Sequence, residues 1–265
     1  MKYNIKENFK ELNENLEKLT TKQEITTYET VTKALENAKL ETNKWMQIED
    51  TVVVFSDLKN STGVSFDKED RTMTKLLEYL NQPFIKIHKS FGAEFIEIKG
   101  DGGLAIYSKE NTIKAVLASI SIKTFYHKHI NAKVKKTYDV NFEVTTGISI
   151  GNLRVKRIGD RKDNFPVWAG ETINLSALLS KELKKDSKPK NSLGITSDIY
   201  DEIKSKKLDD YLYLSCGCGT NETKENLWKF EAIPHKGGRK YYYMNNNWCD
   251  IHGQDYLEEI LDMLK

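Results

Sequence analysis

Apolar residues near the N-terminus recur every three or four positions, a spacing that is typical of amphipathic helices. This spacing predicts helix through most of residues 4–47, with a second helical pattern at about residues 26–40. The first helix carries one apolar stripe, formed by Ile5, Phe9, Leu12, Leu16 and Leu19. Its polar face mixes both charge signs, which argues against binding to a membrane surface. We interpret residues 1–48 as an N-terminal helical arm that acts as a lid or contacts a second copy of the chain.

The pattern changes at Thr51, where the run TVVVFSD has the β-branched and aromatic composition of a buried strand. Helices and short strands alternate from there to about residue 203. The predicted helices cover about residues 71–91, 111–128 and 171–183, and the further predicted strands lie within 93–108, 142–151 and 192–203. This order predicts an α+β fold in which helices cover a sheet, and it assigns residues 49–211 to one domain.

Residues 212–265 differ in composition, with three cysteines, many turn-forming residues and a final helix. We interpret them as a small appendage. Its three thiols and one imidazole could form a tetrahedral, structural zinc site from Cys216, Cys218, Cys249 and His252. Their spacing is not that of a standard zinc finger, so the alternative is three ordinary buried thiols and a histidine that caps a helix.

Composition narrows the class of protein. The 265 residues include 41 basic and 39 acidic ones, a net charge of +2, whereas proteins that bind nucleic acids through charge carry a clear basic excess. No apolar run reaches the ~18 residues that span a bilayer, and the N-terminus lacks the apolar stretch of a secretory signal. Three cysteines do not indicate a disulfide framework. We therefore expect a cytoplasmic protein without nucleic-acid or membrane partners.

Two carboxylates stand at predicted chain reversals. Asp57 ends the strand that begins at Thr51, and Asp101 lies in a Lys-Gly-Asp-Gly-Gly turn between two short strands. Carboxylate oxygens are the ligands that hard divalent cations prefer, and two carboxylates at neighbouring strand ends can hold two metal ions. Such a pair suits phosphoryl transfer, in which positioning and charge neutralisation supply most of the catalysis. The alternative is that each aspartate only caps a turn.

Four segments in order surround these aspartates. They are the run from Phe55 to Thr62, the glycine-rich hairpin at 99–105, a glycine-spaced strand at 147–153, and the element at 165–174. Together they resemble the metal-binding, hairpin, strand and Trp-Gly-x-x-Val-Asn elements of the class III nucleotidyl (adenylate/guanylate) cyclases, with one residue inserted in the last. The resemblance covers about residues 51–200 and implies that family's ferredoxin-like antiparallel sheet.

The resemblance also implies a reaction. The ribose 3′-hydroxyl of a nucleoside triphosphate would attack the α-phosphate, and pyrophosphate would leave. Asp57 and Asp101, with the Leu58 carbonyl, would hold two divalent metal ions, Mn²⁺ or Mg²⁺. The substrate would be bound at Phe55, Asn60, Ser61 and Thr62, where backbone N–H groups of the loop suit its phosphates.

In this family the active site forms between two chains, so the resemblance implies a homodimer in which Asn174 orients the ribose from the partner subunit. One departure is Leu178, which stands where the family places an arginine that meets developing charge. Either another cation substitutes, or the chain is a nucleotide-binding regulatory module without turnover. The candidate cations are Lys181, Arg154, Arg157 and Arg161.

Base selection in the family depends on two positions, which are Glu97 and Pro166 here. A carboxylate accepts hydrogen bonds, so Glu97 favours a base edge that carries N–H, such as uracil, cytosine or guanine. Pro166 offers no donor, and with Phe165 and Trp168 it indicates a small, apolar pocket, although Trp168 could equally be a core residue.

These departures resemble a narrower group, the Pycsar pyrimidine cyclases of bacterial antiphage defence. This resemblance implies that UTP is converted to cyclic UMP, which would activate a separate effector protein. Cyclic CMP and then a guanylate cyclase are the alternatives.

Overall fold

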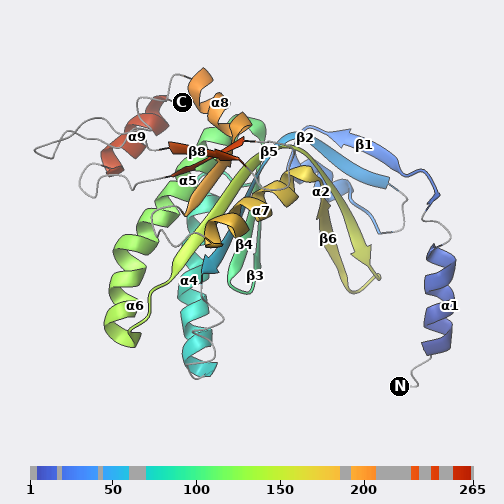
Figure 1. Cartoon of the computed structure of the whole chain (residues 1–265). Helices are drawn as coiled ribbons and strands as arrows, with labels where there is room; N and C mark the ends of the chain where they lie inside the picture. Colours follow the sequence, from blue (N-terminus) through green and yellow to red (C-terminus); the bar gives the residue numbers. More distant parts are fainter. Residues whose placement is uncertain are drawn as a thin grey trace, which may run out of the picture.

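The computed structural model describes most of the chain, as Figure 1 shows. The described residues are 5–16, 20–40, 44–59, 70–185, 192–206, 228–232, 240–244 and 253–263. Among them, nine strands form one sheet whose main path runs β3-β4-β2-β5-β7-β9-β8, with β1 beside β2 and β6 beside β5. The strands are β1 (Glu24–Tyr28), β2 (Lys44–Lys59), β3 (Phe95–Lys99), β4 (Gly102–Tyr107), β5 (Glu143–Gly159), β6 (Asn164–Ala169), β7 (Leu193–Thr196), β8 (Trp228–Ala232) and β9 (Lys240–Met244).

Two long strands form the centre of the sheet. β2 and β5 pair antiparallel along most of their length, with a register irregularity between Ile48 and Thr51. The β-branched run after Thr51 is buried on both faces of the sheet, as the sequence predicts. Most neighbouring strands are antiparallel, while β5 with β7 and β1 with β2 are parallel. The α+β sheet covered by helices is therefore confirmed, with a mixed rather than a purely antiparallel sheet.

One face of the sheet is covered by a layer of helices (Figure 1). The elements of this layer are α4 (Asp70–Ser90), α5 (Thr112–Phe125), the π-helical turn η3 (Tyr126–Ile130), α6 (Asn131–Tyr138), α8 (Ser197–Ser205) and α9 (Gly253–Met263), and a short 3₁₀ turn, η2 (Lys109–Asn111), precedes α5. Their apolar residues pack on Val52, Val54 and Leu58, which alternate along β2 and so share one face. This layer contains the main hydrophobic core.

The opposite face is covered by two helices, α2 (Val31–Asn37) and α7 (Glu171–Lys185). Val53 points to this side and packs in a smaller cluster with Leu104, Ile106, Leu153 and residues of α2. α7 lies close to β5 at Gly147, where an added Cβ would lie 2.7 Å from Leu179 Cβ and would collide with the Ser176 carbonyl. The missing side chain of Gly147 therefore allows α7 to dock on this face.

The N-terminal region follows the prediction only in part. α1 (Ile5–Leu16) is a helix, and the apolar residues of the stripe that it contains are exposed, with Phe9 63% accessible. The helix expected over about 26–40 is wrong at its start, because Glu24–Tyr28 forms the strand β1 beside β2, and helix α2 begins only at Val31. Ile25 and the threonines of β1 favour a strand, and pairing with β2 outweighs the helical spacing. The domain boundary at residue 48 stays a prediction.

Near the C-terminus, β8 and β9 extend the sheet beyond β7 and stack Tyr242 on Tyr200 of α8, with ring centroids 3.7 Å apart. The expected zinc ligands Cys216, Cys218, Cys249 and His252 lie outside the described residues. Whether residues 212–265 form a separate appendage stays a prediction. None of the described helices is long and apolar enough to cross a membrane.

Candidate active site

Strand alternation places Phe55 and Asp57 on the face that α2 and α7 cover. Val53 packs into the cluster on this side, and residues two and four positions further along β2 point the same way. Asp57 is half-buried near the end of the strand. Leu58 points into the main core on the other side and is 1% exposed, so only its backbone could serve a ligand. The strand therefore presents the carboxylate and the aromatic ring to one site.

The hairpin between β3 and β4 brings Asp101 to the same end of β2. Gly103 pairs with Ser56, so Gly102 is the next residue toward Asp57. A Cβ added at Gly102 would lie 3.1 Å from the Ser56 carbonyl and 3.7 Å from Asp57 Oδ1. The turn is held by Asn81 of α4, whose Nδ2 donates to the Gly100 carbonyl at 2.9 Å. The glycine thus leaves space beside Asp57, directly next to Asp101 in the chain.

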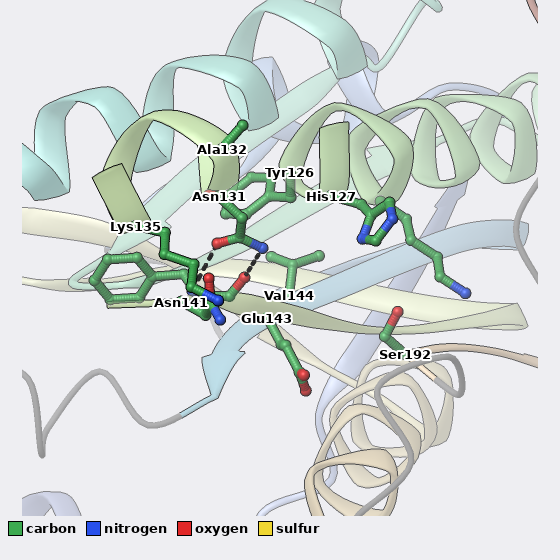
Figure 2. Close-up of a pocket in the computed structure, with 11 residues that line it drawn as sticks. Tyr126, His127, Asn131, Ala132, Lys135, Asn141, Glu143, Val144 and Ser192 are labelled. Atoms are coloured by element: carbon green, nitrogen blue, oxygen red, sulfur yellow. Dashed lines mark hydrogen bonds between the residues drawn. The ribbon is translucent and has the colours of Figure 1, made fainter. Parts of the chain in front are cut away.

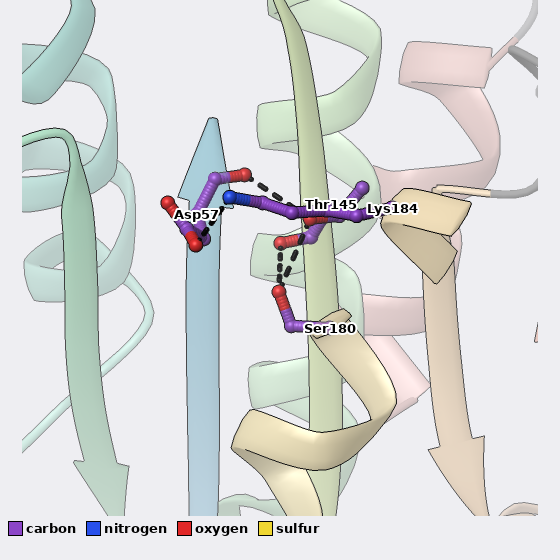
Figure 3. A network of polar contacts seen from close by, with 4 residues as sticks. All are labelled: Asp57, Thr145, Ser180 and Lys184. Carbon is purple, nitrogen blue, oxygen red and sulfur yellow. Dashed lines mark hydrogen bonds and ion pairs between the residues drawn. The ribbon is translucent and has the colours of Figure 1, made fainter. Parts of the chain in front are cut away.

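A lysine that the sequence did not predict binds Asp57. Lys184 in the last turn of α7 donates from Nζ to Asp57 Oδ2, as Figure 3 shows. Lys184 and Asp57 are 29% and 30% exposed, so the ion pair is partly shielded from solvent. Ser180, one helical turn before Lys184, is buried, so Lys184 lies on the face of α7 that docks on the strands.

Hydrogen bonds fix this end of α7 against the strands (Figure 3). Ser180 Oγ donates to the Thr145 carbonyl at 2.9 Å, and its hydroxyl also lies 3.1 Å from Thr145 Oγ1. Thr145 Oγ1 in turn donates to the Asp57 carbonyl at 3.2 Å. The network links α7, β5 and β2, so the helix end that carries Lys184 is anchored beside Asp57.

These residues fit a divalent metal ion. A cation, the Lys184 ammonium, already contacts Asp57, and the glycine side of the hairpin leaves room for ligands. Within the part of the chain that the structure describes, no group of three or more His, Cys, Asp or Glu side chains gathers. A metal here would therefore depend on Asp57, Asp101, backbone carbonyls and the phosphates of a substrate.

Glu97 lies on the same face of the sheet as Asp57. In the register it pairs with Leu104, which in turn pairs with Phe55, so the three residues form one row across β3, β4 and β2. Glu97 Oε2 is buried, and it accepts no hydrogen bond from any residue that the structure describes. It lies 3.4 Å from Lys99 Nζ, whose side chain is 73% exposed. Glu97 Oε2 thus lies on the face of Asp57 with a long ion pair to Lys99 and no hydrogen bond from a described residue.

Glu97 and Lys99 lie two positions apart on β3 and so share one face of the strand. β3 ends at Lys99 and the turn begins at Gly100, which has a φ of +65°, so strand alternation does not extend to Asp101. The charge of Asp101 reaches the helix layer, where burial and then this carboxylate raise the pKa of Tyr126. Asp101 therefore lies in the turn at the tip of the hairpin and not on a face of the strand.

Trp168 packs as part of the protein interior. Its ring lies against Phe95, and it joins two apolar clusters that include Leu35 of α2. The Trp168 Nε1 is buried without a hydrogen-bond partner among the described residues. By contrast, Phe165 on the same strand is 66% exposed. Within one chain the contacts of Trp168 are those of a core residue next to the strand of Glu97.

Asn174 lies far from Asp57 within one chain. It is exposed near the start of α7, ten residues before Lys184, which corresponds to about 15 Å along a helix axis. Leu178 packs against an apolar cluster at the same helix. Of the candidate cations, Lys181 is exposed, Arg154 donates to Gln47 and Arg157 donates to Asn164. The structure therefore brings Asp57, Asp101 and Glu97 to one region of the sheet and leaves Asn174 outside it.

A separate cavity of about 380 Å³ opens between η3, α6 and the start of β5 (Figure 2). The Asn131 side chain accepts from the Phe142 N–H and donates to its carbonyl, both at 2.8 Å. Glu143 at the rim pairs with Lys59 at 3.3 Å. These contacts join the start of β5 to α6 and β2. Asn60, Ser61 and Thr62, expected to bind the substrate, lie outside the described residues.

Comparisons with known proteins agree with this geometry. Residues 43–187, more than half of the chain, match the family described as the adenylate and guanylate cyclase catalytic domain. A protein of Micromonospora echinofusca named uridylate cyclase is 29% identical over 232 residues, which cover 84% of this chain and 73% of that protein. Proteins of the same name from Propioniciclava tarda and Burkholderia cepacia are 28% and 25% identical, over 82% and 64% of this chain and 70% and 73% of their own.

Solved structures share the fold. The adenylyl cyclase CyaB from P. aeruginosa superposes with a TM-score of 0.59 at 16% identity, over 78% of this chain and 98% of that one. The guanylyl cyclase Cya2 gives a TM-score of 0.57 at 16% identity, over 77% of this chain and 93% of that one. At this identity the similarity concerns the arrangement of the chain and not the substrate.

Proposed function

The chain belongs to the adenylate and guanylate cyclase catalytic domain family, and from this premise we propose that it is a uridylate cyclase that converts UTP into 3′,5′-cyclic UMP and pyrophosphate. The observation that carries the choice of substrate is the name shared by its three curated relatives, uridylate cyclase, at 25–29% identity. Glu97 Oε2 is a buried acceptor on the face of Asp57 that has a long ion pair to Lys99 and no hydrogen bond from a described residue, and this supports a base that donates an N–H. Uracil donates from N3.

In the proposed reaction the ribose O3′ forms a bond to the α-phosphorus, and the bond from that phosphorus to the bridging oxygen of the β-phosphate breaks. The O3′ proton is lost to solvent, and pyrophosphate carries away the electron pair of the broken bond. Asp57 and Asp101 are the proposed ligands of two divalent ions, Mn²⁺ or Mg²⁺, with the Leu58 carbonyl completing the set. When bound, such ions stabilise the charge on the attacking and leaving oxygens.

The protein's own side chains would then position the nucleotide. Glu97 accepts from the base edge, and its strand is held by the packing of Phe95 on Trp168. Phe55 lies in the same row of the sheet, near enough in register to contact the ribose or base. Asn60, Ser61 and Thr62 follow β2 in the chain and would offer backbone N–H groups to the phosphates. The site would thus read the base and the phosphates from neighbouring strands.

The proposed active unit is a homodimer. Asn174 lies about 15 Å along α7 from the residue that contacts Asp57. It would therefore act on the ribose bound by the partner subunit, and each of the two sites would use residues of both chains. The exposed apolar residues of the β5–β6 arm, such as Phe165 and Ile158, are suited to a contact between copies.

In the cell, cyclic UMP would act as a second messenger in defence against phages and would activate a separate effector protein. This role is proposed from the resemblance to the pyrimidine cyclases of such systems.

A structural zinc ion at Cys216, Cys218, Cys249 and His252 would stabilise the C-terminal region.

A guanylate cyclase is the second candidate, because guanine also presents N–H groups that Glu97 could accept. The experiment that separates the candidates is incubation of the purified protein with each of the four nucleoside triphosphates and Mn²⁺, followed by identification of the cyclic product. We expect cyclic UMP as the main product. A product from GTP alone would contradict the uridylate assignment. Nucleotide binding without pyrophosphate release from any triphosphate would indicate a regulatory module.

A further inference from the structure

The ion pair between Lys184 and Asp57 joins the end of α7 to the proposed metal ligand. Among the described residues, Asp57 is the one acidic side chain that pairs with Lys184. The neighbouring Lys185, whose side chain is 63% exposed, pairs instead with Glu182, with Nζ 2.8 Å from Oε1. Two adjacent lysines therefore have different roles, and Lys184 faces the site.

We infer that Lys184 takes the place of a metal ion at Asp57 in the metal-free protein, and that metal binding transfers its ammonium group to the triphosphate of the substrate. The inference deepens the proposed function and rests on one part of it, the metal site at Asp57. It makes Lys184 a substrate-binding residue supplied by the same chain as the metal ligands.

The displacement of Lys184 by a metal ion at Asp57 follows from charge and distance. The ammonium group is within hydrogen-bond distance of Asp57 Oδ2, whereas Oδ1 faces Gly102 of the hairpin. A carboxylate that serves two metal ions uses both of its oxygens, so the ion at Oδ2 would need the space of the ammonium group. A dication beside a lysine ammonium would also repel it. Metal binding at Asp57 must therefore break the ion pair and displace the lysine.

The transfer of the Lys184 ammonium group to the triphosphate follows from the acceptors that the displaced side chain can reach. Ser180 and Thr145 anchor the end of α7, so the backbone of Lys184 stays beside the site while its flexible side chain moves. The side chain is 29% exposed, so most of it stays within the site, where an anionic acceptor binds an ammonium group more strongly than a neutral one. A metal-bound triphosphate places phosphate oxygens next to Asp57, and these are anionic acceptors.

The decisive experiment uses the full chain and two binding measurements without turnover. Mn²⁺ alone is titrated by calorimetry into the metal-free protein, and the Mn²⁺ complex of inorganic tripolyphosphate is titrated separately. Tripolyphosphate has no base, so the outcome does not depend on which nucleotide is the substrate. The variant is Lys184→Gln, and Lys185→Gln is the matched control because it removes the same charge one residue away.

We expect opposite effects from the one substitution. Lys184→Gln should bind Mn²⁺ about fivefold more tightly, because the metal no longer displaces a partly exposed ion pair. The same variant should bind the tripolyphosphate complex about tenfold more weakly, because a charge-assisted hydrogen bond is lost. Lys184→Arg should keep most of the tripolyphosphate affinity, and Lys185→Gln should match the wild type in both titrations.

Other outcomes would overturn the inference. Weaker binding of both probes by Lys184→Gln would mean that the lysine only supports the fold. Tighter Mn²⁺ binding with unchanged tripolyphosphate affinity would refute the transfer to phosphate. Unchanged affinities would refute both halves while leaving the cyclase proposal in place. Equal Mn²⁺ binding by wild type and Asp57→Asn would refute the metal site itself, and with it both proposals.

Discussion

The indole ring of Trp168 packs on the ring of Phe95, with ring centroids 5.0 Å apart and an angle of 57° between the planes. This contact joins β6 to β3, although the two strands are not neighbours in the sheet. Phe95 and Glu97 lie two positions apart on β3 and so point to the same face of the sheet. The position of Glu97 therefore depends on the packing of Phe95 on Trp168. A rigid carboxylate can discriminate between bases, because the wrong base leaves it without a partner.

Substitution of Glu97 should therefore change substrate choice more than rate. We expect Glu97→Gln to alter the ratio of UTP to CTP and GTP turnover, while the rate on the best substrate changes less. Glu97→Ala should raise KM or relax selectivity and leave metal binding intact. The measurement is kcat/KM for all four nucleoside triphosphates.

The matched control is Lys99→Gln, which removes the ion pair at 3.4 Å and keeps the carboxylate. It should preserve the wild-type substrate ranking. If Glu97→Gln also preserves that ranking and only lowers the melting temperature, Glu97 is a salt-bridged strand residue and does not read the base.

Loss of either metal-binding aspartate should abolish cyclisation and spare the fold. Asp57→Ala and Asp101→Ala should each lower kcat by at least about a thousandfold, because a two-metal site loses charge stabilisation at the reacting oxygens. The Asp57–Lys184 pair is partly exposed, so its loss should cost no more than about 1 kcal/mol of unfolding free energy. Cyclic product formation tests the loss of activity, and thermal melts test whether the fold is preserved. Glu143→Gln is the control for the removal of a carboxylate charge. Wild-type-like turnover in Asp57→Ala or Asp101→Ala would refute the metal assignment.

Much of the fold could be predicted because local patterns agree with the final structure. The β-branched run after Thr51 forms a buried strand, and the glycine-rich turn at Asp101 forms a hairpin. β1 could not be predicted from spacing, because its strand conformation depends on pairing Glu24 with Lys44, and the two residues lie 20 positions apart. A short segment with both strand-forming residues and helical spacing is decided by such tertiary contacts.

The residues of the site also differ in whether a local pattern or a long-range contact places them. Asp57, Asp101 and Glu97 stand out because each lies in a local motif of a strand end or hairpin. Lys184 does not, because its contact with Asp57 spans 127 residues of chain. Lys181, the one candidate cation on this helix, is exposed, whereas the docking of α7 on β5 brings Lys184 to the site. Only the packing of the helix decides which of its lysines reaches the strand.

Buried His88 should make stability depend on pH. Burial lowers the pKa of His88 to about 3, and its neutral ring contacts the Tyr107 hydroxyl. An unfolded chain titrates this group near its ordinary value of about 6.5, so between about pH 3 and 6.5 the unfolded state binds one more proton. The stability contribution of the neutral ring is therefore complete above pH 6.5 and is lost as the pH falls.

We expect His88 to add up to about 1.4 kcal/mol per pH unit to the slope of unfolding free energy between about pH 6 and 4. Urea titrations at several pH values would measure this slope in wild type and His88→Gln. The variant should be less stable at pH 7 and should have the shallower slope. His127→Gln removes an exposed histidine and should keep the wild-type slope. Equal slopes for wild type and His88→Gln would contradict the buried neutral histidine.

Gly147 should tolerate no side chain. An alanine Cβ there would lie 2.7 Å from Leu179 Cβ and 2.9 Å from Ser180 N, so α7 would have to move away from β5. Gly147→Ala should lose about 3 kcal/mol of unfolding free energy, as overpacked sites do. Gly194→Ala is the control, because the nearest atom there is the flexible end of Leu183, at 3.1 Å. It should cost less than about 1 kcal/mol by chemical denaturation. A similar loss in both variants would argue against the close docking of α7.

The proposed dimer makes a prediction that one chain alone cannot satisfy. If Asp57 and Asp101 act in one subunit and Asn174 acts from the other, then Asp57→Ala and Asn174→Ala proteins are each inactive but complementary. Co-refolding them in equal amounts should produce mixed dimers, half of the total, in which one of two sites is intact. Activity should recover to about a quarter of the wild-type value, as closed two-fold symmetry requires. Mixing Asp57→Ala with Asp101→Ala should restore nothing, because every site then lacks one carboxylate. Recovery in the mixture of Asp57→Ala and Asp101→Ala would mean that one site takes its two aspartates from different subunits. No recovery in the mixture of Asp57→Ala and Asn174→Ala would mean that Asn174 acts in the site of its own chain or outside the reaction.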